Sequence, residues 1–470
     1  MAKRSPIVVI MGSVDHGKTT LLDYIRKTNV AAKEAGGITQ SIGAYEIDHH
    51  GKKVTFIDTP GHEAFSKIKA RGAGIADVAI LIVAADDGVQ PQTKEAMRII
   101  EETKTPFIVA INKIDRQPDT SKVKNELMQA GIFLEGYGGN VSNQPISATT
   151  GEGVSDLLEL ILLTAEMEHM DYDPTHHASG IVLESKMDRR RGVMATLIVT
   201  DGTLKQGDEI IAGNVSGKVK ILENFLGKKA DSISPSSPAI VMGFDSVPKA
   251  GEQFHVGPAS EIAATRIQNK RPVLKEVKEG VVNLILKADV SGSVEALAQV
   301  IKALPLKKEQ SVEIVEEGVG DITDGDVKLA ASTGSIIIGF RTETIKAAET
   351  VARAQNVKIV QSEIIYDLVK AVEETLLTIG KPAALGRLEI LALFSKKGTK
   401  QVIGGEVKEG AISNNAVLEV DHAGKTEGTG KIINLQHNKV DAKSVPAGKQ
   451  CGLIFDSHTE VKVGDILIQR

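Results

Sequence analysis

Residues 12–19 read Gly-Ser-Val-Asp-His-Gly-Lys-Thr and fit the phosphate-binding pattern G-x-x-x-x-G-K-S/T, directly after the apolar run 7–11. Because glycines permit a tight turn, main-chain N–H groups of this loop and of the helix expected from Lys18 to about Arg26 can surround an anion. Lys18 would contact the β- and γ-phosphates of a nucleotide, and the Thr19 hydroxyl would bind Mg²⁺. A chance glycine-rich turn is the alternative, but the strand before the loop and the helix after it favour a phosphate loop.

A second group, Asp58-Thr59-Pro60-Gly61-His62, ends the strand expected at 54–58. A carboxylate at the end of a strand can hold Mg²⁺, usually through water, and the Gly61 N–H can meet a γ-phosphate. The glycine also provides a hinge for a loop that rearranges when this phosphate leaves. Taken alone, the segment is equally well interpreted as an ordinary turn containing Pro and Gly.

The third and fourth groups are Asn112-Lys113-Ile114-Asp115 and Ser147-Ala148-Thr149, each after a short predicted strand. The Asp115 carboxylate can accept hydrogen bonds from both N1–H and the exocyclic amine of guanine, a pattern that adenine lacks. Backbone N–H groups of residues 147–149 would close the base pocket. In this order, the four groups predict a guanine-nucleotide site. The residues predicted to bind the nucleotide are Gly12, Val14, Asp15, His16, Gly17, Lys18, Thr19, Thr20, Asp58, Gly61, Asn112, Lys113, Asp115, Ser147, Ala148 and Thr149.

The elements that must position these groups alternate between strand-like and helix-like stretches over residues 1–172. Strands are expected at 7–11, 54–58, 78–84, 106–112 and 145–147, and helices at 93–103, 122–130 and 154–167. Such alternation predicts a mostly parallel sheet with helices on both faces and ligand loops at the carboxyl ends of the strands. His49-His50-Gly51 is expected at a hairpin tip, with no ligand role.

The composition of the 470 residues, 41% hydrophobic and 25% charged, is ordinary for a soluble globular protein. The longest apolar run, 78–85, is too short to span a bilayer, and the N-terminal residues leave no room for a signal peptide before the first core strand. The single cysteine, Cys451, excludes internal disulfides and cysteine-clustered metal sites. We therefore expect a cytoplasmic protein with no membrane partner. The net charge of −5 argues against wholesale nucleic-acid wrapping, but it leaves room for a local basic face.

Together the motifs resemble those of a translational GTPase, and of bacterial translation initiation factor two in particular. Residues 36–40, Gly-Gly-Ile-Thr-Gln, resemble the switch I segment of that family, and residues 58–65 resemble its switch II segment. The resemblance implies that Thr39 joins Thr19 and Asp58 as a ligand of Mg²⁺. Ser41 is a departure, because the family generally has a histidine at its position.

The resemblance also implies the catalytic group. His62 would orient the attacking water once the ribosome positions it, while Lys18, Thr39 and Gly61 act on the γ-phosphate and its metal. A histidine suits this role because it can form hydrogen bonds while near-neutral at physiological pH. The alternative is a solvated loop histidine that touches nothing. No arginine finger is identifiable in the sequence, so we expect slow intrinsic hydrolysis and large stimulation by ribosomes.

The rest of the chain follows the family order. The resemblance implies a multidomain α/β plus β fold class: a P-loop GTPase domain at 1–172, β-barrel domain II at 178–258, an α/β/α domain III at 278–361, a long linking helix at 362–380 and a C-terminal β-barrel at 385–470. Residues 283–297 closely resemble a signature of the third domain. The arginine run 189–191 either contacts ribosomal RNA phosphates or is a solvated hairpin tip. His176 and His177 are interpreted as part of a linker, because spaced partner ligands are missing.

The C-terminal barrel resembles the domain that recognises the formylmethionyl end of initiator tRNA. The family commonly has a cysteine where this chain has Gly405, so of the usual pair only Cys451 remains. Two interpretations of Cys451 are equally well supported: a small buried hydrophobic residue, or part of the wall of the tRNA pocket.

The resemblance implies a GTP/GDP-binding initiation factor that delivers formylmethionyl initiator tRNA to the small ribosomal subunit, promotes subunit joining and hydrolyses GTP on the ribosome. Its expected partners are the ribosomal subunits and their RNA, this tRNA and other initiation factors, and we expect a monomer. The N-terminal extension of many members is expected to be missing. Two alternatives are a specialised elongation factor, which residues 63–65 argue against, and a non-hydrolysing ribosome-assembly factor, which Thr39 and His62 argue against.

Overall fold

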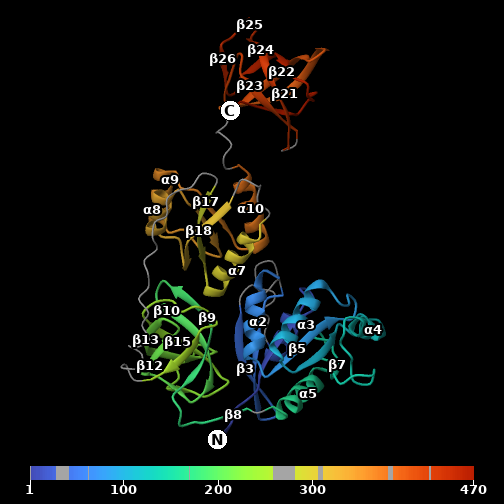
Figure 1. Ribbon diagram of the computed structural model, residues 1–470, viewed down its shortest axis with the longest axis vertical. Coiled ribbons are helices and arrows are strands. Elements are labelled where there is room, and N and C mark those ends of the chain that lie inside the picture. Colours follow the sequence, from blue (N-terminus) through green and yellow to red (C-terminus); the bar gives the residue numbers. More distant parts are fainter. Residues whose placement is uncertain are drawn as a thin grey trace. The chain divides into compact units, whose positions relative to one another are not determined.

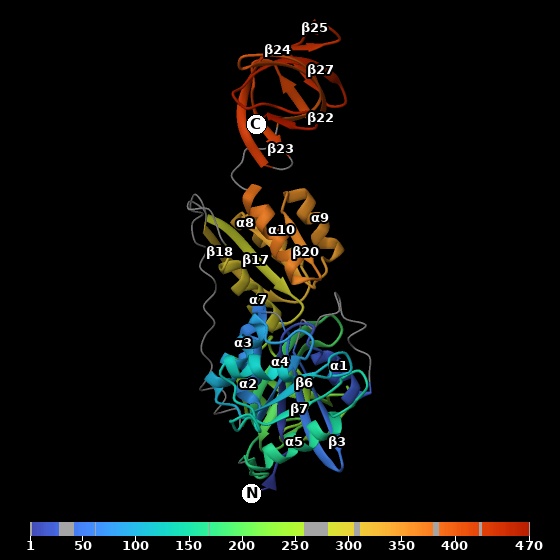
Figure 2. The same cartoon turned by 90° about the vertical axis from the view of Figure 1, so that its right-hand side faces the viewer.

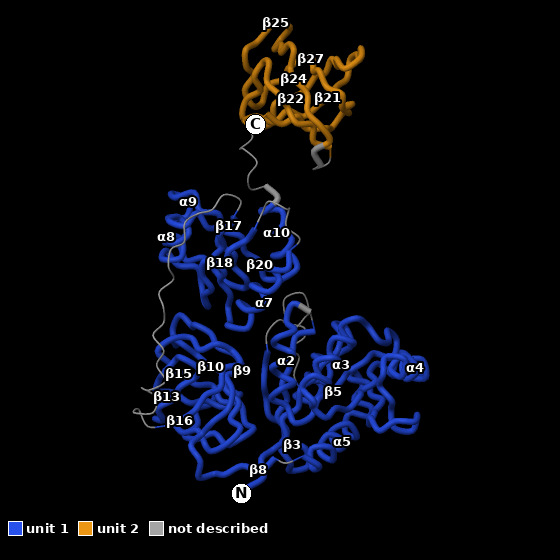
Figure 3. Tube along the Cα trace, in the orientation of Figure 1, with its two compact units in different colours: residues 1–377 blue, residues 378–470 orange. Residues whose placement is uncertain are grey.

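The computed structural model describes residues 2–27, 42–61, 63–168, 170–257, 281–304, 311–378, 385–422 and 425–469. Residues 1–377 form one unit and residues 378–470 form a second, and each is taken by itself below (Figure 3). Within the described ranges, no helix is long and apolar enough to cross a membrane.

The first sheet of the larger unit has the strand order β3-β4-β2-β5-β6-β7, and its neighbouring strands are parallel except for the β3–β4 hairpin (Figure 1). Its strands are β2 (Ile7–Gly12), β3 (Gly43–His49), β4 (Lys52–Asp58), β5 (Val78–Ala84), β6 (Phe107–Asn112) and β7 (Asn143–Pro145). The helices of this stretch are α1 (Lys18–Arg26), α2 (Ser66–Ile75), α3 (Pro91–Thr103), α4 (Ser121–Gln129) and α5 (Val154–Glu166), with a 3₁₀ turn, η3, at Glu63–Phe65.

Strands β2 and β5 are buried along their whole length, because central parallel strands are covered by helices on both faces. Leu21 of α1 and Ile161 of α5 share one core with Ile10 of β2. On the other face, Gly72 of α2 lies close to Val9. The predicted parallel arrangement is therefore confirmed. One prediction was displaced: the strand expected at 145–147 is β7, Asn143–Pro145, because the main chain from residue 146 onward turns into a loop.

The next segment of the larger unit is a closed barrel with the strand order β10-β15-β13-β12-β16-β9. Its strands are β9 (Ser179–Asp188), β10 (Gly192–Asp201), β12 (Glu209–Ala212), β13 (Val215–Asn224), β15 (Pro238–Phe244) and β16 (Gln253–Val256). Two short pairs accompany the unit, β1 (Ala2–Lys3) with β8 (Asp171–Tyr172), and β11 (Leu204–Lys205) with β14 (Ser232–Ile233). Alternating side chains such as Leu197 and Val199 fill the barrel interior.

Residues 281–378 carry a parallel sheet with the order β18-β17-β19-β20, in which β17 and β18 lie side by side (Figure 2). Its elements are β17 (Val281–Ala288), α7 (Ser291–Lys302), β18 (Ser311–Val319), α8 (Asp324–Thr333), β19 (Ile336–Phe340), α9 (Lys346–Gln355), β20 (Ile359–Ser362) and α10 (Ile365–Thr378). The helix expected over 362–380 is described only as α10, because Ser362 ends β20 and its hydroxyl accepts a hydrogen bond from the Ile364 N–H. One face of α10 is buried, and it carries Ile365, Leu368, Val372 and Leu376.

The second unit is a strand-rich barrel. Its strands are β21 (Gly386–Lys397), β22 (Lys400–Ser413), β23 (Val417–His422), β24 (Lys425–His437), β25 (Val440–Asp441), β26 (Ser444–Pro446), β27 (Gln450–Asp456) and β28 (Ile466–Gln469). Strand pairing follows β21-β28-β23-β24-β27-β22, and β22 also pairs with β21, which closes the ring. Cys451 lies in its hydrophobic core, and burial raises the pKa of the thiol to about 11. This favours the interpretation of Cys451 as a buried apolar residue.

Candidate functional site

The loop between β2 and α1 follows a path that requires glycine at two positions. Gly12 and Gly17 have φ values of +149° and +90°. A Cβ on Gly12 would collide with the Ile82 carbonyl oxygen, and a Cβ on Gly17 would collide with the Asn112 side chain. Asp15 also has a positive φ, +66°, a conformation that Asp tolerates better than most side chains. The loop therefore has the tight path, ending at a helix N-terminus, that a phosphate-binding loop needs.

Lys18 begins α1, and its side chain is buried inside the loop. Its Nζ donates hydrogen bonds to the carbonyl oxygens of Gly12 (3.0 Å) and Ser13 (2.6 Å). Burial lowers the pKa of the Lys18 ammonium to about 8, whereas the negative charge of Asp58 acts in the opposite direction. A buried ammonium group is well suited to phosphate oxygens, which would stabilise its charge in place of the water that burial removes.

Two further predicted residues lie beside Lys18. Asp58 ends β4 and is buried, and its charge is close enough to influence the pKa of Lys18. Gly61 is also buried, and a Cβ there would lie 2.7 Å from Lys18 Nζ and 3.1 Å from the main-chain nitrogen of Val14. The structure thus brings the predicted γ-phosphate glycine directly against the phosphate loop. Thr19 and Thr20 follow Lys18 in the first turn of α1, Thr19 partly buried and Thr20 exposed.

The switch I prediction, residues 36–41 with Thr39 and Ser41, lies outside the described residues. The same holds for His62. The roles proposed for these residues therefore depend on the sequence and on the described residues next to them.

Asn112, at the end of β6, connects the two halves of the site. Its Nδ2 donates to the main-chain oxygen of His16 (2.8 Å), and its Oδ1 accepts from the Ala148 N–H (2.9 Å). The side chain is only 2% exposed. Asn112 therefore holds the phosphate loop and the loop at 147–149 together.

The guanine-recognition residues follow. Asp115 is exposed, and its Oδ1 accepts a hydrogen bond from the Ser147 hydroxyl (2.7 Å), which orients the carboxylate. The Ser147 oxygen also accepts from the Thr150 N–H (3.1 Å), so the loop that carries Thr149 is tied to the same hydroxyl. Lys113 has a φ of +67°, and its Nζ lies 3.4 Å from Asp86. A fixed, solvent-facing carboxylate beside these backbone N–H groups can read the two donors of guanine.

The His16 side chain points behind the loop. It is fully buried, with Nδ1 3.3 Å from the Ile82 oxygen and Nε2 3.1 Å from Asp87 Oδ2. Burial lowers the pKa of this imidazole, with Asp87 acting against it. The side chain is thus part of the packing of β5 against the loop, and His16 contributes to the site through its main chain.

Gln92, near the start of α3, supports the site although no sequence motif points to it. Its Oε1 accepts hydrogen bonds from the Val14 N–H (2.8 Å) and from the Ser13 hydroxyl (2.9 Å). The sequence contained one indication that this segment lies near the site. Residues 85–92 follow β5, so they begin at the same edge of the sheet as the other ligand loops. A glutamine in the first turn of a helix carries no motif of its own, so its hydrogen-bond partners could not be predicted.

This geometry defines the class of protein. Residues 3–167 match the family described as Elongation factor Tu GTP binding domain, and residues 177–257 match Elongation factor G domain 2. Together with the phosphate loop and the base-recognition residues, these matches identify a translational GTPase that binds guanine nucleotides.

The particular family follows from the rest of the chain. Residues 259–373 match Translation-initiation factor 2. Over 99% of its length, the chain is 40% identical to the translation initiation factor IF-2 of Clostridium tetani, of which it covers 71%. It is 43% identical to that of Persephonella marina, with 99% and 56% of the two chains covered. The crystal structure of GDP-bound aIF5B from Aeropyrum pernix is 27% identical, with 100% and 92% coverage and a TM-score of 0.51. The chain belongs to the translation initiation factor IF-2 family and is an initiation factor GTPase.

Proposed function

We propose that this factor, with GTP bound, holds formylmethionyl initiator tRNA on the small ribosomal subunit and promotes subunit joining. In this proposal the ribosome then triggers GTP hydrolysis. The observation that supports it best is the position of Gly61 against Lys18 and Val14, since a loop that senses the γ-phosphate must lie there. Residues 1–172 would act as the nucleotide switch, and residues 385–470 would bind the tRNA.

We propose that Thr19, Asp58 and Thr39 hold Mg²⁺. The donor set fits the ion, because hydroxyl and carboxylate oxygens are the hard ligands that Mg²⁺ prefers, and Thr19 and Asp58 lie at the phosphate end of the site. When bound, the ion would neutralise charge on the β- and γ-phosphate oxygens.

The chain's own residues have distinct roles in the proposed reaction. Main-chain N–H groups of the loop and the Lys18 ammonium would hold the β- and γ-phosphates in place and stabilise the negative charge that develops on them. Gly61 would donate its N–H to the γ-phosphate, which fixes the start of switch II. His62, the next residue, would then orient the attacking water when the ribosome positions it.

The test of this catalytic role is His62→Ala. We expect ribosome-stimulated GTP hydrolysis to fall at least about 10²-fold, because a positioned hydrogen-bonding group is lost. GDP affinity should stay unchanged, since Lys18 and Asp115 remain. Equal turnover with and without ribosomes in the parent protein, or unchanged turnover in the variant, would contradict the proposed mechanism.

The tRNA role has a separate test. The full-length chain should bind methionyl initiator tRNA more tightly when the methionine is formylated. Absence of any such preference, with GDP binding intact, would leave an initiation-type GTPase whose last domain does not read the formyl group. This outcome would separate the proposed nucleotide function from the proposed tRNA function.

A further inference from the structure

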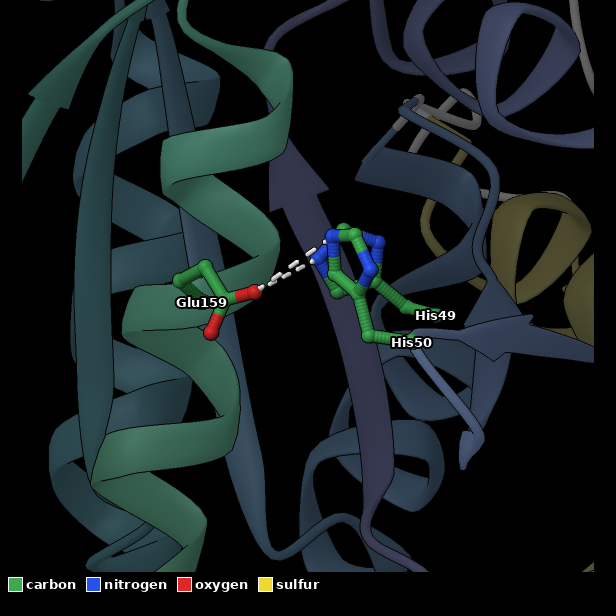
Figure 4. Close-up of side chains that lie close together, drawn as sticks. All are labelled: His49, His50 and Glu159. Carbon is green, nitrogen blue, oxygen red and sulfur yellow. Dashed lines mark hydrogen bonds and ion pairs between the residues drawn. The ribbon is translucent and has the colours of Figure 1, made fainter.

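Three side chains with metal-binding atoms meet at the tip of the β3–β4 hairpin. His49 is the last residue of β3, His50 occupies the turn, and Glu159 projects from α5 (Figure 4). His49 Nε2 lies 3.1 Å from Glu159 Oε1, and His50 Nε2 lies 3.8 Å from the same oxygen. Among the described residues, these three form the group of three or more His, Cys, Asp or Glu side chains whose ligand atoms all lie within 4.8 Å of one another.

The turn geometry explains how two adjacent histidines can face one carboxylate. Successive side chains of a strand point to opposite faces of the sheet, so neighbouring residues normally diverge. His50 instead has a φ of +51°, which turns the chain, and the two imidazole rings come within 4.3 Å between centroids. The hairpin is fixed by its register, in which His49 pairs with Lys52, and the Asp48 side chain accepts the Gly51 N–H at 2.9 Å.

The spacing fits a first-row transition metal. Zinc bonds to imidazole nitrogen and carboxylate oxygen at about 2.0–2.2 Å, which places the ligand atoms of a tetrahedral site roughly 3.3–3.6 Å apart. The two observed nitrogen-to-oxygen distances of 3.1 and 3.8 Å bracket this spacing. Side-chain shifts of a few tenths of an ångström would be enough, and His50 and Glu159 are exposed, at 74% and 59%.

We propose that His49, His50 and Glu159 form a binding site for Zn²⁺ or a similar divalent transition metal, with water as the fourth ligand. Imidazole nitrogens favour this class of metal over Mg²⁺ and Ca²⁺, which take oxygen ligands. The sequence alone predicts no ligand role for the two histidines, because nothing in it places Glu159 beside the hairpin.

The bound metal would join an edge strand to a helix. Among the described strands, β3 is the last in the order of this sheet. The hairpin tip is held against α5 by the ion pair of Lys52 with Glu166 (2.6 Å). Exposed ion pairs of this kind contribute little. A metal bridge between His49, His50 and Glu159 would hold the hairpin on α5 more firmly.

A second histidine cluster provides the matched control. His176 Nδ1 lies 2.8 Å from Asp201, and its Nε2 lies 3.6 Å from Asp173. Because the two carboxylates approach opposite edges of one ring, they cannot bind a single ion together with that imidazole. The His176→Ala variant therefore removes an exposed histidine beside carboxylates without removing a chelating group.

The experiment is calorimetric titration of the full chain with ZnCl₂, in excess Mg²⁺ and GDP so that the nucleotide site is saturated. We expect one Zn²⁺ per chain, bound in the micromolar range. His50→Ala and Glu159→Gln should each weaken binding about tenfold or more, whereas His176→Ala should leave it unchanged. Co²⁺ in place of Zn²⁺ should give the visible absorption of a four-coordinate site, and His50→Ala should remove it.

His50 is exposed, so its replacement should leave the melting temperature in EDTA unchanged. A melting temperature raised by Zn²⁺ in the parent chain and not in His50→Ala would support the bridge between the hairpin and α5. Absence of Zn²⁺ binding by the parent chain, or equal binding by the parent and His50→Ala, would overturn the proposal.

Discussion

The phosphate loop and the strand pair β22–β27 of the C-terminal barrel both depend on glycine, but for different physical reasons. Gly12 and Gly17 have positive φ values, which most side chains adopt only with strain. Gly405 pairs with Cys451 in a strand ladder. Its neighbours leave no room for a side chain, because a Cβ would collide with Leu388 and the Glu389 carbonyl oxygen. A glycine required by the backbone belongs to a motif that can be recognised in sequence, whereas a glycine required by packing does not.

The largest effect is expected at the nucleotide site, where the sequence motifs predict the function of each residue. Asp115→Asn replaces an acceptor that would receive both guanine donors, so GDP affinity should fall at least about 10³-fold. Affinity for xanthosine diphosphate, which has an oxygen at the position of the guanine amine, should rise. Equilibrium binding of both nucleotides measures this. Asp119→Asn is the control, because Asp119 is an exposed carboxylate whose Oδ1 accepts from the Ser121 N–H. Equal losses in both variants would contradict the assignment.

The second prediction concerns the C-terminal barrel, where packing requires a glycine at position 405. Gly405→Cys introduces the residue that the family resemblance implies at this position, and we expect it to destabilise this barrel by about 1–3 kcal/mol, because Glu389 and Leu388 must move. Hydrogen exchange of amides in β22 of the full chain reports this local stability. Gly452→Ala is the control, since Gly452 lies opposite Gly404 on the paired strand and a Cβ there meets nothing within 4 Å. If amide exchange in β22 is the same in Gly405→Cys as in the parent chain, the barrel accommodates the cysteine side chain at no cost in local stability, and the prediction is wrong.

A third prediction concerns the pH dependence of nucleotide binding. In the nucleotide-free protein, burial lowers the pKa of Lys18 from 10.5 to about 8, so the neutral amine becomes the main form above pH 8. Phosphate binding requires the ammonium form, and the proton must then be taken up. GDP affinity should therefore be constant below about pH 7 and fall roughly tenfold between pH 7 and 9.

Lys18→Arg is the comparison for this measurement, because a guanidinium does not titrate in that range and the same base is bound. Its affinity should be lower throughout but show a smaller pH dependence. Parallel pH profiles for the two proteins would assign the titration to another group.

The residues that could be predicted are those whose chemistry depends on local sequence. Gly12, Lys18 and Asp115 are predicted as site residues because a turn, a helix N-terminus or the end of a strand gives each of them a defined place. The contact of Gln92 with the Val14 N–H could not be predicted, because it depends on how α3 packs against the phosphate loop. The same holds for Glu159 beside His49, which are 110 positions apart in the chain. Long-range contacts of this kind leave no periodic signal in a single sequence.

The smallest effect is expected for Gln92. Its long-range contact connects a residue without a motif to the phosphate loop, which is predictable from local sequence. Gln92→Ala removes the acceptor for the Val14 N–H and for the buried Ser13 hydroxyl, so the loop loses an external support while its glycines remain. A net loss of about 1 kcal/mol, or about fivefold in GDP affinity, is expected from one such acceptor.

The neighbouring Gln90 provides the control for this prediction, because its amide donates to Asp87 at the exposed start of α3. Gln90→Ala should bind GDP as the parent chain does. If Gln92→Ala also binds normally, the main chain alone holds the loop in its binding conformation. If the loss approaches that of Asp115→Asn, Gln92 determines the conformation of the phosphate loop, and a residue outside every recognised motif is as important for this site as the motif residues.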